Sequence, residues 1–316
     1  MMTYKIGFDI GGTKCAVVCG LETAEGMKVE KKVSFPTDHT LSPYQILDKM
    51  IAAAKEMGVS FSSVGISCGG PLDSKRGLIL SPPNLPGWDN VAATEYISRA
   101  LGVPAYLQND ANACALAEWK YGAGRGYQNV IFLTFGTGMG AGLILDGRLY
   151  SGASDMAGEI GHVRVEPFGP VGYGKAGSFE GFCSGAGIAQ MGKTLARERF
   201  QMGKSVAFCQ TPDELEDVTA KKIGEYADKG DKDALAVYDL CAEKLGFGLS
   251  ILIDVLNPDC IVIGSIFQRQ PYLFVDKMQA VIDKEALPQA AAACKILPAA
   301  LGNSIGDYAA LAVAED

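Results

Sequence analysis

Two segments of this chain, residues 4–20 and 130–146, share one pattern that limits how the whole chain can fold. Each segment begins with a run of strand-forming apolar residues, turns at a cluster of glycine and threonine, and returns as a second apolar run. A hairpin that recurs after nearly half the chain indicates two halves of related design. We therefore expect an α/β protein with two similar domains.

The other expected elements agree with a two-domain chain. A length of 316 residues exceeds what one hydrophobic core usually holds. We predict an N-terminal α/β domain over residues 1–108 and 303–316 and a C-terminal α/β domain over residues 109–302. Periodicity predicts strands at 4–10, 15–20, 28–34, 63–67, 104–107, 130–135, 141–146 and 260–263, and helices at 42–57, 92–101, 110–122, 213–228, 231–256 and 271–285.

The composition excludes several classes of function. With 28 Lys and Arg against 36 Asp and Glu, the net charge is -8, and no basic run is long enough to follow a nucleic-acid backbone. The first residues enter a strand without a charged and apolar leader, and no stretch has the length of apolar sequence that a membrane span needs. Nine cysteines without a Cys-x-x-Cys pair predict reduced core thiols. We expect a cytoplasmic protein that binds neither nucleic acid nor membrane.

The two glycine-rich turns have the residue types that bind phosphate. In the first, Asp9-Ile10-Gly11-Gly12-Thr13-Lys14, glycines let backbone N–H groups approach phosphate oxygens, and Thr13 adds a hydroxyl donor. Asp9 could orient a magnesium ion through its waters. A Gly-Gly pair alone is more often only a turn. The matching turn Gly136-Thr137-Gly138-Met139-Gly140 favours the functional interpretation, because two such hairpins facing across a cleft can hold a triphosphate from both sides.

Asp110 is the candidate catalytic residue, and its position in the sequence has two interpretations. The segment Asn109-Asp110-Ala111-Asn112 begins a helix directly after a strand. A carboxylate at a helix start is stabilised by the free N–H groups there, so Asp110 could simply be a cap. In a cleft with two phosphate hairpins, a carboxylate here also suits the task of accepting a proton from an attacking alcohol.

Polar residues elsewhere suit the binding of a polyhydroxylated ligand. Gly158-Glu159-Ile160-Gly161-His162 contains one of only two histidines, beside a carboxylate and between glycines. A lone histidine is more often a packed or surface residue. Together with Glu180, however, Glu159 and His162 offer the donors and acceptors that fix sugar hydroxyls. The turn-rich loop at 81–90 could also present Asn84 and Trp88 to a ligand.

Taken together, these motifs resemble the ROK family (repressor, open reading frame, kinase), which are sugar kinases of the hexokinase, Hsp70 and actin superfamily. The resemblance covers nearly the whole chain, and the order and spacing of the motifs make it specific. The matching segments are 9–14, Gly-Gly-Pro at 69–71, Asn-Asp-Ala-Asn at 109–112, Gly-Thr-Gly-x-Gly at 136–140, Gly-Glu-Ile-Gly-His at 158–162, and Asn-Pro-Asp at 257–259 before the strand that ends at Gly264.

The resemblance implies a two-domain actin-like ATPase (ribonuclease H-like) fold, with the active site in the cleft and the final helix returning to the N-terminal domain. It implies an ATP-dependent kinase that transfers the γ-phosphate to the 6-hydroxyl of glucose or a related hexose, with Mg²⁺, Asp110 as general base, and a homodimer. The implied sugar contacts are Gly70, Asn84, Asn109, Asp110, Glu159, His162 and Glu180, and the implied ATP-site residues are Asp9, Gly11, Gly12, Thr13, Lys14, Thr137, Gly138 and Gly264.

Two departures from the family pattern affect these expectations. Many members follow the histidine with Cys-x-Cys-Gly-x-x-Gly-Cys-x-Glu, in which the histidine and three thiolates bind a structural zinc. Here the stretch 171–180 has Val171, Tyr173 and Ser178 at the cysteine positions, so we predict no zinc and expect packing, by Tyr173 and Phe179, to hold the loop. Members of the repressor branch have a helix-turn-helix domain before the first hairpin, whereas eight residues precede Asp9 in this sequence.

Other functions remain open from sequence alone. A sugar-responsive binding or regulatory protein would keep the same motifs without turnover, although the intact Asp110 and both hairpins argue against it. A kinase for an N-acetylhexosamine, or one that uses polyphosphate, is also compatible, because backbone N–H groups do not recognise a nucleobase.

Overall fold

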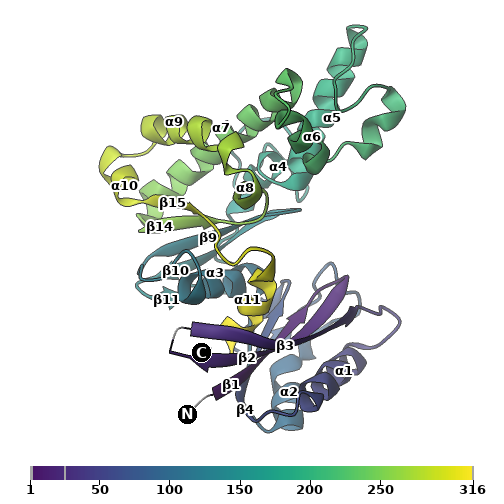
Figure 1. Ribbon diagram of the computed structural model, residues 1–316, viewed down its shortest axis with the longest axis vertical. Coiled ribbons are helices and arrows are strands. Elements are labelled where there is room, and N and C mark those ends of the chain that lie inside the picture. Colours follow the sequence, from purple (N-terminus) through teal and green to yellow (C-terminus); the bar gives the residue numbers. More distant parts are fainter. Residues whose placement is uncertain (1–2, 25, 315–316) are drawn as a thin grey trace. The chain divides into compact units, whose positions relative to one another are not determined.

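The computed structural model describes residues 3–24 and 26–314 (Figure 1). The chain forms two compact units. The first unit contains Met1–Phe132, Gly142–Ala157 and Ala300–Asp316, and the second contains Leu133–Ala141 and Gly158–Ala299. The boundaries that we predicted from the sequence, after residue 108 and before residue 303, differ from these divisions and stay a prediction.

A five-stranded sheet forms the centre of the first unit. Its order is β3 (Gly26–Pro36), β2 (Lys14–Thr23), β1 (Thr3–Ile10), β4 (Phe61–Cys68) and β8 (Ala105–Asn109). Strand β1 runs antiparallel to β2 and parallel to β4. Helices α1 (Pro43–Glu56) and α2 (Ala93–Leu101) contribute apolar side chains to the core on one face of this sheet, and Figure 1 shows the two helices side by side.

The loop that follows β4 contains three short strands and packs into the same core. The strands β5 (Leu72–Asp73), β6 (Leu78–Ile79) and β7 (Val91–Ala92) form a small antiparallel sheet. Trp88 is only 2% exposed and belongs to the core. The expectation that Trp88 faces a ligand is therefore wrong, because burying a large aromatic ring outweighs the turn chemistry of the residues around it.

The final helix covers the other face of the first sheet. Helix α11 (Ile305–Val313) packs on β1 and β4 and against α3 (Asp110–Tyr121). Glycines on the sheet allow this close approach: a Cβ atom at Gly7 would lie 2.8 Å from the Cβ of Ala310, and one at Gly20 would lie 2.7 Å from Leu311. The expected return of the last helix to the N-terminal part of the fold is confirmed.

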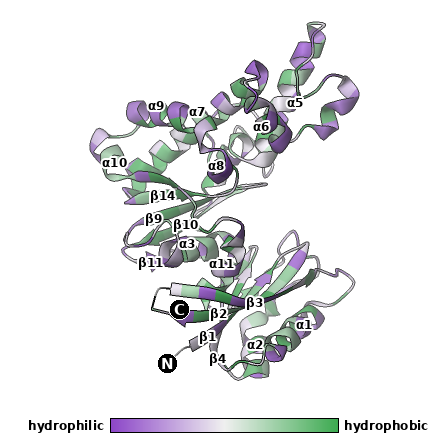
Figure 2. Ribbon diagram, in the orientation of Figure 1, coloured by the Kyte–Doolittle hydropathy of each residue, from purple (hydrophilic) through white to green (hydrophobic). Residues whose placement is uncertain are grey.

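The second sheet repeats the strand order of the first. It runs β11 (Arg148–Leu149), β10 (Met139–Leu145), β9 (Val130–Phe135), β14 (Cys260–Ile263) and β15 (Lys295–Pro298). In both sheets the hairpin strands lie beside a strand that enters from later in the sequence. Figure 2 shows β9 and β14 as hydrophobic along most of their length, as expected for strands buried on both faces. The two related halves predicted from the hairpin repeat are confirmed.

The second unit is mainly helical outside its sheet, and here the sequence predictions were less accurate. The helix expected at 213–228 is two elements, a 3₁₀ turn Pro212–Asp217 and α6 (Ala220–Ala227), because Thr219 starts a new helix by capping it. The helix expected at 271–285 is the 3₁₀ turn Pro271–Leu273 followed by α9 (Val275–Glu285). The other helices are α4 (Phe179–Phe182), α5 (Gly185–Gln201), α7 (Lys232–Leu256), α8 (Ile266–Arg269) and α10 (Pro288–Ala293), and the short elements are β12 (Val171–Gly172), β13 (Lys175–Ala176) and the 3₁₀ turn Ile160–His162. The 3₁₀ turn Gly302–Ser304 lies in the first unit.

Within residues 3–24 and 26–314, no helix has both the length and the apolar character that crossing a membrane requires.

Candidate active site

The predicted residues of the first unit gather at one edge of its sheet. Strands β1, β4 and β8 are parallel, and their register places Ile10 beside Cys68 and Cys68 beside Asn109. The residues that follow these strands are the first hairpin turn, the Gly69-Gly70 pair and Asp110. Ligand sites of parallel sheets form beyond the carboxyl ends of the strands, so this register brings the candidate residues to a common edge.

The first hairpin turn leaves two consecutive backbone donors open. The N–H of Gly11 donates to the carbonyl of Lys14 at 3.1 Å and closes the turn. Thr37 supports it, because its hydroxyl donates to the carbonyl of Gly11 at 2.6 Å and its N–H donates to that of Thr13 at 3.0 Å. No acceptor within the described part of the chain receives the N–H of Gly12 or Thr13.

Gly12 also packs against the loop that contains Asn84. A Cβ atom at Gly12 would lie 2.8 Å from the Cβ of Asn84 and would overlap its carbonyl oxygen. Any larger residue at position 12 would therefore separate the hairpin from this loop. The glycine serves close packing as well as access to the backbone, and it places a predicted sugar contact beside a predicted phosphate contact.

Asp9 lies among other charges at the end of β1. Burial, and next the nearby Asp307 carboxylate, raise the pKa of Asp9 to about 6, with a further contribution from Asp110. Asp307 lies on α11 and pairs with Lys32 of β3 at 2.6 Å between Nζ and Oδ1. Neither Asp307 nor Lys32 was predicted, because their positions in the sequence give no sign that they lie near Asp9.

The raised pKa of Asp9 predicts a stability that depends on pH. The folded protein binds the proton of Asp9 more tightly than the unfolded chain does, so stability falls as the pH rises from about 4 to above 6. Replacing Asp9 by Asn is expected to raise the free energy of unfolding of the ligand-free protein by roughly 1–3 kcal/mol at pH 8, and to change it little near pH 4. Urea denaturation at both pH values measures the difference, and an equal effect at both would contradict this assignment.

Asp110 is the first residue of α3 but not its cap. Asn109 is the cap, because its Oδ1 accepts the N–H of Asn112 at 2.7 Å. Asp110 Oδ1 accepts the N–H of Ala111 at 2.9 Å. Desolvation by the surrounding chain raises the pKa of the Asp110 carboxyl above its ordinary value, although the residue as a whole is exposed, and hydrogen bonds from backbone N–H groups oppose this only in part. A raised pKa makes a carboxylate a better proton acceptor, which suits a general base.

The second hairpin turn has the same design as the first. Gly136 N–H closes the turn by donating to the carbonyl of Gly138 at 3.1 Å, Gly140 N–H donates to Oγ1 of Thr134 at 2.8 Å, and Met139 N–H donates to Oε2 of Glu180 at 2.9 Å. The N–H groups of Thr137 and Gly138 find no acceptor among the residues described. Each hairpin therefore presents two adjacent free donors, the arrangement that binds phosphate oxygens.

The glycines of the segment 158–162 allow it to pack on strand β10. Ala141 N–H donates to the carbonyl of Gly158 at 2.9 Å. A Cβ atom at Gly161 would overlap the carbonyl of Met139 and lie 3.3 Å from the Cβ of Glu180. This packing holds His162 next to the Glu180 region. The His162 side chain is exposed and its ring faces the Tyr173 ring edge-on, with centroids 6.3 Å apart.

Hydrogen bonds hold the loop whose cysteines are replaced. The amide of Gln190 on α5 accepts the N–H of Val171 at 3.0 Å and donates to its carbonyl at 2.8 Å. Lys175 Nζ donates to the carbonyl of His162 at 2.7 Å, and Ser178 caps α4 by accepting the N–H of Gly181 at 3.1 Å.

Packing contributes through Phe179 but little through Tyr173. Phe179 is fully buried and packs against Gly248 of α7, as expected. Tyr173 is 81% exposed, so the expected packing role of Tyr173 is limited to its contact with His162. No group of three or more His, Cys, Asp or Glu side chains within residues 3–24 and 26–314 is placed to hold a metal. The predicted absence of zinc stays a prediction.

Gly264 lies next to the second hairpin, and the residue after it is strained. Gly264 N–H donates to the carbonyl of Leu133 at 3.0 Å, which aligns the end of β14 with β9. Ser265 follows with φ 56° and ψ −109°, a conformation that L-residues avoid. A Cβ atom at Gly136 would lie 3.5 Å from Oγ of Ser265, so the strained residue borders the hairpin turn.

Relieving this strain should stabilise the protein. Replacing Ser265 by Gly is expected to raise the free energy of unfolding by about 1 kcal/mol, because glycine adopts a positive φ without strain. Glycine also makes the unfolded chain more flexible, which offsets part of this gain. Urea denaturation measures the change. Replacing Ser304, which precedes α11 at φ −90°, by Gly should instead lower stability, and equal effects of the two changes would contradict the strain argument.

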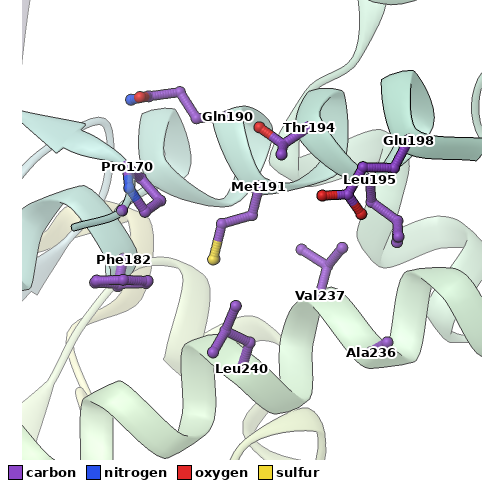
Figure 3. A pocket seen from close by; sticks show the side chains of 11 residues that line it. Pro170, Phe182, Gln190, Met191, Thr194, Leu195, Glu198, Ala236, Val237 and Leu240 are labelled. Atoms are coloured by element: carbon purple, nitrogen blue, oxygen red, sulfur yellow. The ribbon is translucent and has the colours of Figure 1, made fainter. Parts of the chain in front are cut away.

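The cavity in Figure 3 lies in the second unit and contains none of the predicted site residues. It has a volume of about 580 Å³. Figure 3 shows side chains of α5, such as Met191, pointing toward Val237 and Leu240 of α7. Its lining is mostly apolar, unlike the polar residues predicted to bind sugar and phosphate.

The predicted residues thus form two groups, one in each unit, and comparison with known proteins shows the family of the chain. The sequence profile of the ROK family matches residues 5–316. The chain belongs to the ROK family. This family member is 32% identical to a glucokinase of Thermotoga maritima over 282 residues, 88% of this chain and 87% of that protein. It is 31% identical to a glucokinase of Halalkalibacterium halodurans over 312 residues, 96% of this chain and 92% of that protein.

Solved structures agree with the fold of this ROK family member. A ROK family glucokinase from Streptomyces griseus, in complex with glucose and AMPPNP, has a TM-score of 0.73 at 28% identity, with 99% of both chains covered. The predicted two-domain actin-like ATPase fold is confirmed. More distant relatives differ in their described roles: an N-acetylmannosamine kinase of Escherichia coli is 29% identical over 85% of both chains, and a xylose repressor of Caldicellulosiruptor bescii is 28% identical over 77% of this chain and 60% of that protein.

Proposed function

We propose that this protein is an ATP-dependent hexose kinase that transfers the γ-phosphate to the 6-hydroxyl of glucose or a related sugar. The observation that carries the proposal is the Asp110 carboxyl, with its raised pKa, at the same sheet edge as the open N–H groups of Gly12 and Thr13. A proton acceptor and a phosphate-binding turn are the two parts that phosphoryl transfer to an alcohol requires. Relatives about a third identical that are named glucokinases support it.

The free backbone donors of both hairpins are the proposed phosphate contacts. Gly12, Thr13, Thr137 and Gly138 each offer an N–H that pairs with no described residue, and Gly11, Lys14 and Gly264 border them. Neutral N–H groups fixed in a turn bind phosphate oxygens without the cost of ordering flexible side chains. This donor set fits the triphosphate of ATP, the proposed phosphoryl donor.

Asp9 is the proposed contact for Mg²⁺. Its carboxyl is largely buried beside Asp307, and no described residue donates a hydrogen bond to it. Carboxylate oxygens and water are the ligands that Mg²⁺ prefers, so this acidic position fits a hydrated magnesium ion. When bound, Mg²⁺ would neutralise charge on the phosphates.

Six residues besides Asp110 are the proposed sugar contacts. Their side chains and backbone offer the carboxylate, amide and imidazole groups that hydrogen-bond to hydroxyls. The six are Gly70, Asn84, Asn109, Glu159, His162 and Glu180.

Asp110 performs the proton transfer in this proposal. As the sugar oxygen forms its bond to the γ-phosphorus and the bond to the leaving oxygen of ADP breaks, the hydroxyl proton passes to the Asp110 carboxylate. The open hairpin N–H groups stabilise the negative charge of the transferring phosphoryl group. The protonated Asp110 then returns its proton to solvent.

A coupled assay of ADP release with Mg-ATP tests the function. Glucose, mannose, fructose and the N-acetylated hexosamines are compared as acceptors. We expect turnover with glucose or a related hexose. Turnover with N-acetylmannosamine alone would show that the substrate is the sugar in the name of the Escherichia coli relative and not glucose. Binding of sugar by calorimetry without ADP release would instead favour a sugar-responsive regulator, and activity with polyphosphate but not ATP would change the donor.

The homodimer, the cytoplasmic location and the absence of zinc stay predictions. Light scattering of the purified protein and elemental analysis for zinc test the first and the last.

A further inference from the structure

Glu180, a proposed sugar contact, also holds the second hairpin turn. Its Oε2 accepts the N–H of Met139 at 2.9 Å. Gly138 makes room for this bond, because a Cβ atom there would lie 2.7 Å from the same oxygen. The other carboxylate oxygen, Oε1, receives no hydrogen bond from any described residue. One carboxylate therefore has one oxygen on the hairpin and one available to a ligand.

The residues that follow Glu180 bind the other end of the same turn. Helix α4 ends at Phe182, and Ser184 then caps α5 by accepting the N–H of Gly187 at 2.9 Å. The first N–H groups of α5 point at the hairpin: Gly185 N–H donates to the carbonyl of Gly136 at 2.7 Å, and Ala186 N–H donates to that of Thr137 at 3.4 Å. The segment 180–186 thus contacts the turn at both ends.

These bonds surround the two donors that the nucleotide would use. The carbonyls of Gly136 and Thr137 accept hydrogen bonds from α5, and the N–H of Met139 donates to Glu180. The N–H groups of Thr137 and Gly138, which lie between these bonds, have no acceptor among the described residues. The orientation of a peptide N–H depends on the peptides on either side of it. Movement of the Glu180 carboxylate would therefore reorient the Gly138–Met139 peptide next to the open pair.

We propose that Glu180 is a positioning residue of the nucleotide hairpin, through which sugar binding strengthens ATP binding. A sugar hydroxyl donating to Oε1 of Glu180 fixes the carboxylate, and the carboxylate fixes Met139 and the turn through Oε2. Because coupling between two binding sites is reciprocal, the nucleotide strengthens sugar binding by the same factor. This inference rests on the proposed function, since it places the sugar at Oε1 of Glu180 and the nucleotide at the hairpin turn that Oε2 holds.

Calorimetric titration with Mg-AMPPNP, with and without saturating glucose, tests the coupling. For the wild-type protein we expect glucose to tighten AMPPNP binding by about tenfold. In Glu180→Ala we expect AMPPNP binding without sugar to weaken about fivefold and the effect of glucose to disappear. Glu180→Gln keeps a carbonyl oxygen for Met139, so its AMPPNP affinity without sugar should return close to the wild-type value.

Two further variants separate positioning from loss of sugar binding. His162→Asn removes a proposed sugar contact that has no bond to the hairpin, so it should weaken glucose binding while leaving AMPPNP affinity without sugar unchanged. Gly138→Ala displaces the Glu180 oxygen from the hairpin while keeping the carboxylate, and should weaken AMPPNP binding as Glu180→Ala does. If circular dichroism shows that Glu180→Ala is not folded, AMPPNP binding by Gly138→Ala tests the proposal in its place.

The outcomes for the coupling and for the proposed function are distinct. Wild-type AMPPNP affinity in both Glu180→Ala and Gly138→Ala, or an undiminished glucose effect in them, overturns the coupling even if the wild-type enzyme releases ADP. Loss of coupling in these variants, with no ADP release by the wild type, supports the coupling and overturns the kinase. A wild-type protein that does not bind AMPPNP overturns both.

Discussion

Replacing Asp110 by Asn is expected to lower kcat by about a hundredfold to ten-thousandfold while changing KM for the sugar only a few-fold. The amide keeps the size of the side chain and one oxygen for the N–H of Ala111, but it cannot accept the hydroxyl proton. Asn109 continues to cap α3, so the helix start should stay intact. Steady-state kinetics with Mg-ATP and the sugar found in the acceptor panel measure the loss.

Asp48→Asn is the matched control. Asp48 is an exposed carboxylate on α1 of the same unit, where it accepts a hydrogen bond from Tyr96 at 2.7 Å. Its replacement should change kcat less than about twofold, as surface substitutions away from special features usually do. Equal activities of Asp110→Asn and Asp48→Asn would remove Asp110 from the chemistry.

The pH profile gives a second test of the same residue. Asp110 acts as a base only when ionised, and desolvation raises its pKa, so kcat/KM of the wild-type enzyme should fall on the acid side at a pH above the ordinary range of an aspartate. The residual activity of Asp110→Asn should lack that acid limb. An acid limb that persists unchanged in the variant would belong to another group.

Replacing Glu118 by Ala is expected to lower the free energy of unfolding by about 4 kcal/mol. Glu118 lies on α3 and is fully buried. Its carboxylate accepts three backbone N–H groups, from Ala123 at 2.8 Å, Ala300 at 3.1 Å and Leu301 at 2.9 Å. Removing it leaves these three donors without their acceptor and leaves a cavity, and each buried unpaired group costs about 1–3 kcal/mol. Urea denaturation at pH 7 measures the loss.

Two controls define the cause of that loss. Glu118→Gln keeps the shape and one acceptor oxygen but turns a donor toward backbone N–H groups, so it should lose an intermediate amount of stability. Glu95→Ala removes an exposed carboxylate that pairs with Arg99 at 2.6 Å, and it should cost less than about 1 kcal/mol. A Glu118→Ala protein as stable as Glu95→Ala would show that the three hydrogen bonds do not hold this part of the fold.

The fold was predictable where local pattern and packing agree. The apolar runs around Gly11-Gly12 and Gly136-Gly138 are strands, and the repeated sheet order explains why the same pattern occurs twice. Helix α5 was missed because it begins inside a glycine-rich stretch. Gly185 and Gly187 lower helix propensity but permit contact with the hairpin and with α4, so a tertiary requirement overrides the local preference.

The candidate site was predictable in its residue types but not in its supporting contacts. Motif spacing indicated Asp110 and the hairpin residues, whereas the contacts of Glu118 with residues 300 and 301 and the pair of Lys32 with Asp307 join positions that are distant in sequence. A single sequence contains no record of such pairs. The Gly-Glu-Ile-Gly-His motif shows the same limit, because its glycines serve packing on β10, which no local rule foresees.

The most direct test of the kinase assignment is ³¹P NMR of the products formed from Mg-ATP and glucose, or the hexose selected by the acceptor panel, with wild-type protein and Asp110→Asn side by side. We expect a sugar 6-phosphate resonance that grows in step with ADP for the wild type and is nearly absent for the variant. ADP with inorganic phosphate alone, or an equal yield of sugar phosphate from both proteins, would contradict it.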